Sequence, residues 1–141
     1  MKLEFEIDDV WGGIAPVKAH PDDAGFDLAI PEDFEMDGAC MLTACTGVHV
    51  LIPAGFYGLI LPRSSMSARM VYCVTGVIDA GYTGEICVSL FNASGKRQTF
   101  KAGDRIAQLV LVPSPAFELA QGEIKSVKTE RGAHGFGSSG R

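Results

Sequence analysis

Two stretches of the sequence combine cationic and hydroxyl groups with glycine in a way that suits an anionic ligand. LPRSSMSARM contains Arg63 beside Ser64 and Ser65, at the start of a segment with helical composition. Backbone N–H groups at a helix start, with a guanidinium group beside them, bind phosphate well. RGAHGFGSSG, residues 131–140, adds Arg131 and four glycines, whose backbone can turn N–H groups toward an anion. Both stretches indicate phosphate contacts; the structural alternatives are a capped turn and a disordered terminus.

Acidic, aromatic and amide side chains mark three other stretches. GVIDAGYTGEI places Asp79 and Tyr82 in a tight turn between apolar segments, which by itself predicts a β-hairpin. DAGFDLAI carries Asp27 just after an Asp–Ala–Gly turn. Gln108 is a lone polar residue in the apolar stretch AGDRIAQLV. A buried amide without a partner costs about 1–3 kcal/mol, so we expect this one to bond backbone or ligand. Phe136, among the C-terminal glycines, has a ring that can stack on a base.

The overall charge of the protein argues against nucleic acid as a partner. The net charge of −5 and the pI of about 5.1 argue against binding to a nucleic-acid backbone. A small polyphosphate ligand stays compatible, because a local pocket or a metal ion can reverse the field. The N-terminus MKLEFEIDDV is acidic where a signal peptide is apolar, and no apolar stretch reaches transmembrane length. We therefore predict a cytoplasmic protein that binds neither nucleic acid nor membrane.

Four cysteines, Cys40, Cys45, Cys73 and Cys87, occur in the chain. In a cytoplasm we expect reduced and mostly buried thiols. The Cys40–Cys45 spacing is wider than a C-x2-C pair, and neither H-x-x-H nor H-E-x-x-H is present. We therefore expect no structural or catalytic zinc site.

The elements that must position these groups are mainly strands. Apolar residues recur with period two, and glycine-rich turns separate the alternating segments, which predicts an all-β sandwich or barrel. The clearest alternating segments are 2–7, 47–53, 84–92 and 106–112. The segment 106–112 is apolar on nearly every residue, as expected where subunits pack together. We expect a short helix near 64–70 with a serine cap, one β domain over 1–121, and an arm over 122–141.

Five stretches, taken in order, resemble the five motifs of the trimeric deoxyuridine triphosphate nucleotidohydrolases, or dUTPases. They are DAGFDLA at 23–29, PRSSMSA at 62–68, GVIDAGYTGE at 76–85, GDRIAQL at 103–109 and RGAHGFGSSG at 131–140. The resemblance implies a jelly-roll-like β-barrel of the β-clip type, assembled as a homotrimer whose active sites are shared between subunits. It also implies that the flexible C-terminal arm closes as a lid over bound nucleotide.

The implied reaction is hydrolysis of dUTP to dUMP and pyrophosphate, which lowers dUTP and supplies dUMP for thymidylate synthesis. By resemblance, Asp79 activates the water that attacks the α-phosphorus. Tyr82 packs against the deoxyribose, where a ribose 2′-hydroxyl would clash. Backbone groups of the turn that includes Gly76 and Ile78 read the uracil edge. Two departures are that MVYCVTG lacks the base-contacting Asn of some relatives, and that Gly81 replaces their Asp.

The remaining implied roles concern the triphosphate. Phe136 stacks over uracil, and Asp27 holds Mg²⁺ through water while the triphosphate supplies the other ligands. The residues that match phosphate-contacting or lid positions are Arg63, Ser64, Ser65, Gln108, Arg131, Gly137 and Ser138. Mg²⁺ is therefore the expected cofactor and dUTP the expected small-molecule partner.

Two other functions compete with this one. A dCTP deaminase-type enzyme shares the fold, which makes it an analogy at the level of fold. A nucleotide-binding regulatory trimer would use the same pocket without hydrolysis, and a phage origin would favour a protein partner. The segment 31–47 is the place for a partner-binding insertion, with a surface hairpin as the alternative. No role follows from the sequence for His134.

Overall fold

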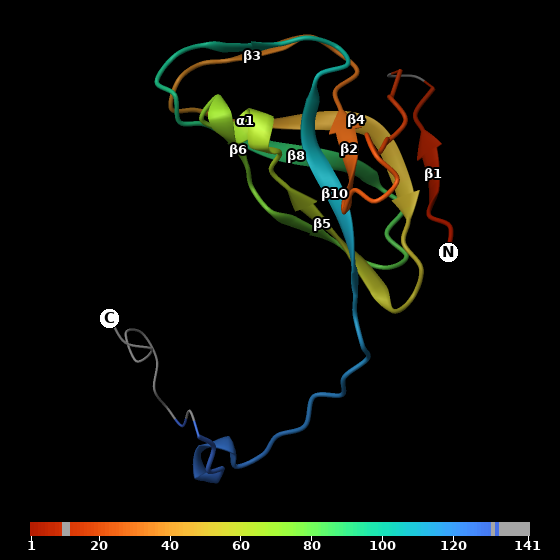
Figure 1. Cartoon of the computed structure of the whole chain (residues 1–141), viewed down its shortest axis with the longest axis vertical. Coiled ribbons are helices and arrows are strands. Elements are labelled where there is room, and N and C mark those ends of the chain that lie inside the picture. Colours follow the sequence, from red (N-terminus) through yellow and green to blue (C-terminus); the bar gives the residue numbers. More distant parts are fainter. Residues whose placement is uncertain (10–11, 131, 133–141) are drawn as a thin grey trace.

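The computed structural model describes residues 1–9, 12–130 and 132, and Figure 1 shows the course of the chain. In the described residues nearly all of the regular secondary structure is β-strand, so the all-β prediction is confirmed. The strands are β1 (Glu4–Ile7), β2 (Gly25–Ala29), β3 (Phe34–Met36), β4 (Met41–Leu51), β5 (Phe56–Leu61), β6 (Val71–Cys73), β7 (Gly76–Ile78), β8 (Glu85–Asn92), β9 (Gln98–Phe100) and β10 (Arg105–Pro113). The helical elements are α1 (Ser64–Ala68) and the 3-10 turn η1 (Ile124–Ser126).

Two four-stranded antiparallel sheets share one hydrophobic core. Their strand orders are β1-β4-β8-β6 and β2-β10-β5-β7, and β3 and β9 form a separate two-stranded sheet at one end of the molecule (Figure 1). Leu109 of β10 and Leu28 of β2 belong to the same buried cluster as Val48 of β4 and Ile86 of β8. The arrangement agrees with the jelly-roll-like barrel that the resemblance implied.

Alternation along β8 shows why these sequences form strands. Ile86, Val88 and Leu90 point into the core, whereas Cys87 and Ser89 lie on the outer side. Side chains of a strand point alternately to its two faces, so a period-two pattern buries one face of the sheet. This confirms the alternation predicted for 84–92.

The single α-helix predicted near 64–70 is present as α1, but its cap differs from the expectation. The N-cap is Arg63 in an extended conformation, without a side-chain capping hydrogen bond, and Ser64 is already inside the helix. The predicted serine cap is therefore wrong. Met70 follows in the left-handed region with φ of 57°, which ends the helical stretch.

The predicted β-hairpin around Asp79 is also wrong. β7 pairs with β5, whereas β8 pairs with β4 and β6 in the other sheet. The turn at 79–84 therefore carries the chain from one sheet to the other. β7 and β8 are both apolar, but they form hydrogen bonds with strands of different sheets.

The segment 31–47 does not form a surface hairpin, because its two strands β3 and β4 pair with other strands. Its strand β3 pairs with β9, and Phe34 stacks on Phe100 with ring centroids 4.6 Å apart. Met36 is buried in the core. The rest of the segment continues into β4, where Ala44 lies in the core and Leu42 packs against it.

Beyond β10 the chain leaves the barrel (Figure 1). In residues 114–130 the only regular element is η1, and apolar side chains there are open to solvent. Phe117 is 84% exposed and Leu119 fully so. Among the described residues, no helix has the length and apolar character needed to cross a membrane.

The expectation of four reduced, mostly buried thiols is wrong for one pair. Cys45 and Cys87 form a disulfide, and both residues are exposed. Cys73 is free and buried, and its burial raises the pKa of the thiol. The pairing of β4 with β8 places Cys45 directly opposite Cys87, which their distance in sequence did not indicate.

Asn92 is a polar residue that is completely buried at the end of β8. Its Nδ2 donates hydrogen bonds to the carbonyl oxygens of Met36, Asp37 and Lys96 at 3.3, 2.9 and 2.7 Å. Its Oδ1 accepts from the backbone N–H and the hydroxyl of Ser94, at 3.0 and 2.7 Å. One amide therefore holds the loop after β3 to the loop after β8.

We expect Asn92→Ala to lower the free energy of unfolding by about 3 kcal/mol, because a fully buried amide and the hydrogen bonds that it makes to two loops would be lost. Urea unfolding at one fixed chain concentration measures this loss. Thr43→Ala is the control, because the hydroxyl of Thr43 makes an exposed 3.3 Å contact with that of Ser89 in the described part of the chain, and its loss should change little. Equal midpoints for the two variants would contradict the role given to Asn92.

Candidate active site

Gln108 in β10 lies between β2, which carries Asp27, and β5, which leads into Arg63. It pairs with Asp27 in β2 on one side and with Leu61 in β5 on the other. Its Nε2 donates a 3.0 Å hydrogen bond to the carbonyl oxygen of Pro62, just before Arg63. The expectation that the amide bonds to backbone or ligand is confirmed. Three motifs distant in sequence therefore meet at one edge of the sheet.

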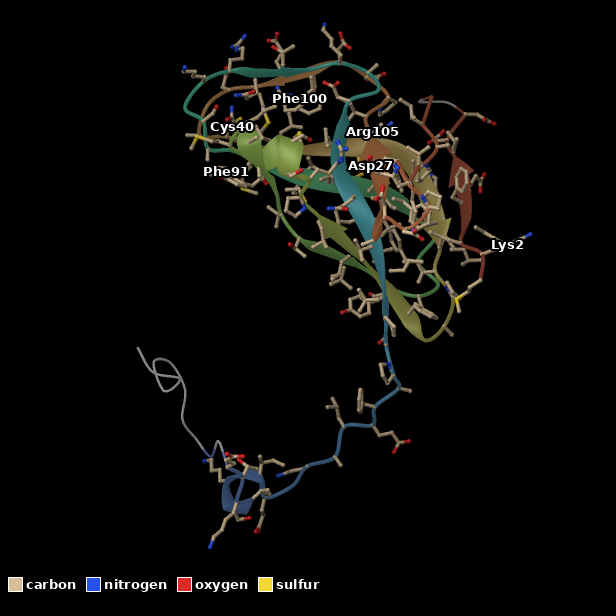
Figure 2. All side chains as sticks on the ribbon, viewed as in Figure 1. Lys2, Asp27, Cys40, Phe91, Phe100 and Arg105 are labelled. Carbon is tan, nitrogen blue, oxygen red and sulfur yellow. A yellow bond between two sulfur atoms is a disulfide. The ribbon has the colours of Figure 1, made fainter. Side chains whose placement is uncertain are left out.

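The carboxylate of Asp27 binds two arginines at this edge. Arg63 Nε lies 2.7 Å from Oδ1 of Asp27, and Arg63 Nη2 donates to Oδ2 at 3.1 Å. Arg105 Nη1 reaches the same Oδ2 at 3.0 Å. Figure 2 shows Asp27 and Arg105 close together on β2 and β10. The Asp27 side chain is 13% exposed and those of Arg63 and Arg105 are 26% and 43% exposed.

The group of Asp27, Arg63 and Arg105 carries a net positive charge. Two guanidinium groups share one carboxylate, and the arginines are the more exposed members, so their remaining N–H groups are available to an anion. Arg105 was missed by the sequence reasoning. The signal for it was its place in GDRIAQL, three residues before Gln108, but only the pairing of β2 with β10 reveals its partner.

Hydroxyl groups extend the same edge. Ser64 and Ser65 are exposed in the first turn of α1. Nη1 of Arg63 donates to the carbonyl oxygen of Arg105 at 3.0 Å and lies 3.5 Å from Oγ of Ser65. We call Asp27, Arg63, Ser64, Ser65, Arg105 and Gln108 the arginine edge. Its donors are fixed by the barrel, as an anion-binding site requires.

The turn after β7 carries the other predicted residues. Asp79 is exposed, and the N–H of Tyr82 donates to its carbonyl oxygen at 3.2 Å. The hydroxyl of Tyr82 donates to the carbonyl oxygen of Glu85 at 3.2 Å. A Cβ added at Gly84 would collide with the Tyr82 ring, so glycine makes room for the ring. Gly81 has φ of 79°, a backbone conformation that glycine adopts without strain.

The arginine edge and the Asp79 turn are separated within one chain. β7 runs antiparallel to β5, with Gly76 opposite Ile60 and Ile78 opposite Gly58. Because α1 follows the Leu61 end of β5, the chain moves away from Arg63 as it approaches Asp79. In the part of the chain that the structure describes, no hydrogen bond or ion pair joins Asp79 or Tyr82 to the arginine edge. The predicted residues Arg131, Phe136, Gly137 and Ser138 lie outside the described residues.

Comparison with known proteins gives a consistent result. The sequence matches the dUTPase family over residues 13–140. It is 40% identical over 132 residues to the deoxyuridine 5'-triphosphate nucleotidohydrolase of Rhodococcus erythropolis, covering 89% of this chain and 78% of that protein. It is 39% identical over 139 residues to the enzyme of that name from Tropheryma whipplei, covering 92% of this chain and 91% of the other.

Solved structures agree with the sequence comparison. The dUTPase of Staphylococcus bacteriophage 80alpha with dUPNHPP has a TM-score of 0.87 and 31% identity, and the match covers 99% of both chains. That study describes phage dUTPases as controlling transfer of virulence genes by a proto-oncogenic G protein-like mechanism. A variant dUTPase of phage phi11 of S. aureus, described for its coordination of a structural Mg(II) ion, has a TM-score of 0.80 and 27% identity. That match covers 87% of this chain and 97% of the phage protein.

Proposed function

Because the chain belongs to the dUTPase family, we propose that it is a dUTP diphosphatase that hydrolyses dUTP to dUMP and pyrophosphate. The observation that carries this proposal is the arginine edge, where Arg63, Arg105 and Gln108 present fixed donors to an anion. In a cell the reaction lowers dUTP and supplies dUMP for thymidylate synthesis.

The arginine edge is the site for the triphosphate. The protein is acidic, with a net charge of −5, so its overall field repels a polyanion. The local excess of guanidinium groups at Arg63 and Arg105 offsets that field where the phosphates bind. Ser64, Ser65 and Gln108 add neutral donors. Their role is to hold the α-phosphate in one orientation for attack.

We place the chemical step at the Asp79 turn of a neighbouring subunit. Asp79 and Tyr82 have no contact with the arginine edge of their own chain among the described residues, whereas the reaction needs both groups around one nucleotide. A homotrimer with shared sites satisfies this requirement. The half-buried outer residues Val110 and Val112 of β10 are suited to packing between subunits.

In the proposed mechanism, Asp79 accepts a proton from a water molecule as that water attacks the α-phosphorus. A phosphorus–oxygen bond to the water oxygen forms, the bond to the β-phosphate breaks, and pyrophosphate leaves. Arg63 and Gln108 stabilise the charge that develops on the α-phosphate oxygens. The Tyr82 ring, set over Gly84, packs on the deoxyribose and excludes a 2′-hydroxyl. Backbone groups of Gly76 and Ile78 contact uracil.

Mg²⁺ is part of the proposal, but not as a direct ligand of Asp27. Both carboxylate oxygens of Asp27 already accept from arginines, so direct ligation does not fit this geometry. Mg²⁺ would be held by the triphosphate oxygens and would contact Asp27 only through water. Its chemistry is to neutralise phosphate charge.

The C-terminal residues complete the proposed site. Arg131 would reach the γ-phosphate, Phe136 would stack on uracil, and Gly137 and Ser138 would close over the phosphates. Their assignment rests on the motif RGAHGFGSSG. The exposed course of residues 114–130, which runs away from the barrel of its own chain, supports an arm that acts at another subunit.

Product analysis tests the function directly. The protein is mixed with Mg²⁺ and dUTP, and parallel reactions contain UTP, dTTP or dCTP. We expect dUMP and pyrophosphate from dUTP alone. Ammonia from dCTP would replace the proposal with a deaminase. Tight binding of dUTP without turnover would replace it with a regulatory trimer. The structure of the phage 80alpha dUTPase is described in terms of control of gene transfer, which is a regulatory role.

Arg105 gives a sharper test of the arginine edge. We expect Arg105→Gln to raise the KM for dUTP about tenfold with a smaller effect on kcat, because the loss of one charge-assisted contact loosens Asp27 and Arg63. Steady-state kinetics measure both constants. Arg97→Gln is the matched control, since among the described residues Arg97 pairs with Glu35 and Asp37 on an exposed surface, and the change should leave both constants unchanged. A parental KM for Arg105→Gln would mean that Arg105 contributes to dUTP binding neither directly nor by holding Asp27 and Arg63 in place.

A further inference from the structure

Two cysteines face each other on the outer side of the sheet β1-β4-β8-β6. Cys45 of β4 lies directly opposite Cys87 of β8, and their Cα atoms are 4.1 Å apart. This is the close spacing of a non-hydrogen-bonded pair in an antiparallel ladder. The strand register is what brings the sulfur atoms together. After reduction of the disulfide, the same register would keep two thiols side by side.

Glu85 adds an oxygen ligand to this pair. It lies two residues before Cys87 on β8, so both side chains leave the same face of the sheet. Its Oε1 accepts a 2.7 Å hydrogen bond from the backbone N–H of Gly47. Gly47 has φ of 65° and sits where the β4–β8 register shifts, so a local bulge aims this N–H at the carboxylate. Such a bond orients a ligand while its other oxygen stays available to a metal.

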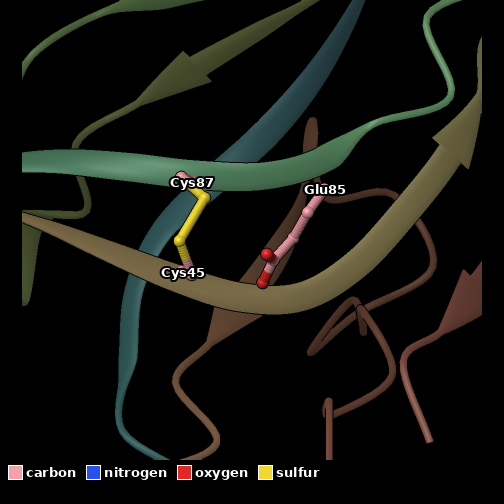
Figure 3. Close-up of side chains that lie close together, drawn as sticks. All are labelled: Cys45, Glu85 and Cys87. Carbon is pink, nitrogen blue, oxygen red and sulfur yellow. A yellow bond between two sulfur atoms is a disulfide. The ribbon is translucent and has the colours of Figure 1, made fainter. Parts of the chain in front are cut away.

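The three groups have the composition and spacing of a metal site. The two sulfur atoms and a carboxylate oxygen of Glu85 lie within 4.8 Å of one another (Figure 3). Thiolates select borderline or soft cations over Mg²⁺. We propose that Cys45, Cys87 and Glu85 form a Zn²⁺ site in the reduced protein. The earlier expectation of no zinc site considered only ligands close in sequence, whereas 42 residues separate these cysteines.

The surroundings leave room for a fourth ligand. A cavity of about 500 Å³ borders the site, and Cys45 and Glu85 are among the residues that line it. Zn²⁺ bound by three protein groups keeps one tetrahedral position for water. The cation therefore reaches the site from solvent and carries an exchangeable ligand there.

Zinc binding and the disulfide exclude each other, because both use the same sulfur atoms. Binding converts two thiols into two zinc-bound thiolates and releases two protons. The oxidised pair must first be reduced by a dithiol, which supplies two electrons and two protons and becomes a disulfide itself. The oxidised form shown here is therefore the form that cannot bind the metal.

Cobalt provides a spectroscopic test on the full chain. The protein is reduced with a dithiol, desalted without oxygen, and titrated with Co²⁺ and then Zn²⁺. We expect one Co²⁺ per chain, with a thiolate-to-cobalt charge-transfer band that Zn²⁺ abolishes. The oxidised protein should show no band. A second measurement loads the metal before subunits assemble, in case assembly slows entry of added metal into the site. Protein expressed with added zinc and purified under reducing conditions should contain one zinc per chain by metal analysis.

Variants separate this site from other thiols. Cys45→Ser with Cys87→Ser should abolish the band, and Glu85→Gln should weaken Co²⁺ binding at least about tenfold. Cys40→Ser is the matched control, because Cys40 is a free cysteine outside the cluster and its loss should change nothing. The proposal is overturned if the reduced parent binds no metal while its thiols titrate fully. A band that persists in the double variant overturns it as well.

Discussion

Asp79→Asn should lose a hundredfold to ten-thousandfold in kcat while it still binds nucleotide. The amide has nearly the same shape as the carboxylate but cannot accept the proton of the attacking water, and general-base catalysis is worth about that factor. Asp79 is exposed and its turn is held by backbone bonds, so the substitution should leave the fold unchanged. Single-turnover hydrolysis of dUTP measures the chemical step. Calorimetry with dUPNHPP, the compound present in the phage 80alpha structure, measures binding.

Asp22→Asn provides the control for this experiment. Asp22 is another exposed aspartate, which has no part in the proposed mechanism, and it undergoes the same change of charge. Its turnover should equal that of the parent. Full turnover by Asp79→Asn would remove Asp79 from the mechanism. Loss of dUPNHPP binding together with turnover would assign it to binding instead.

Deletion of residues 131–141 should lower kcat/KM for dUTP about a hundredfold or more and leave an assembled protein. The deleted motif supplies the proposed contacts of Arg131 and Phe136, and it would exclude bulk water from the reacting phosphate. The barrel does not need it, because the core is made by residues 28–109. Steady-state kinetics measure the loss, and light scattering after size exclusion measures the assembly.

Two further variants show whether activity depends on the sequence of the C-terminal arm or on its length. Removal of Arg141 alone should have no effect, since it lies beyond the fifth motif. Replacement of residues 131–140 by glycine and serine, at equal length, should be as inactive as the deletion. An arm-deleted enzyme with parental kcat/KM would refute the lid. A deletion that dissociates the protein would assign the arm to assembly.

Several features were predictable from the sequence because they depend on neighbours in the chain. The alternation in 84–92 predicts a strand with one buried face, since side-chain direction in a strand reverses at every residue. The short helix at Ser64–Ala68 was predictable in the same way. The cap and the turn at 79–84 were not, because a cap depends on local backbone angles and a strand's partner depends on the whole sheet.

The five motifs, and with them the family and the reaction, follow from the sequence by itself. This includes Arg131 and Phe136, which only the sequence assigns. Tertiary structure alone decided which groups meet: Arg105 with Asp27, Gln108 with Pro62, and Cys45 with Cys87. Each contact joins strands far apart in the chain, and strand pairing is chosen by the collective burial of the core, which no local pattern encodes.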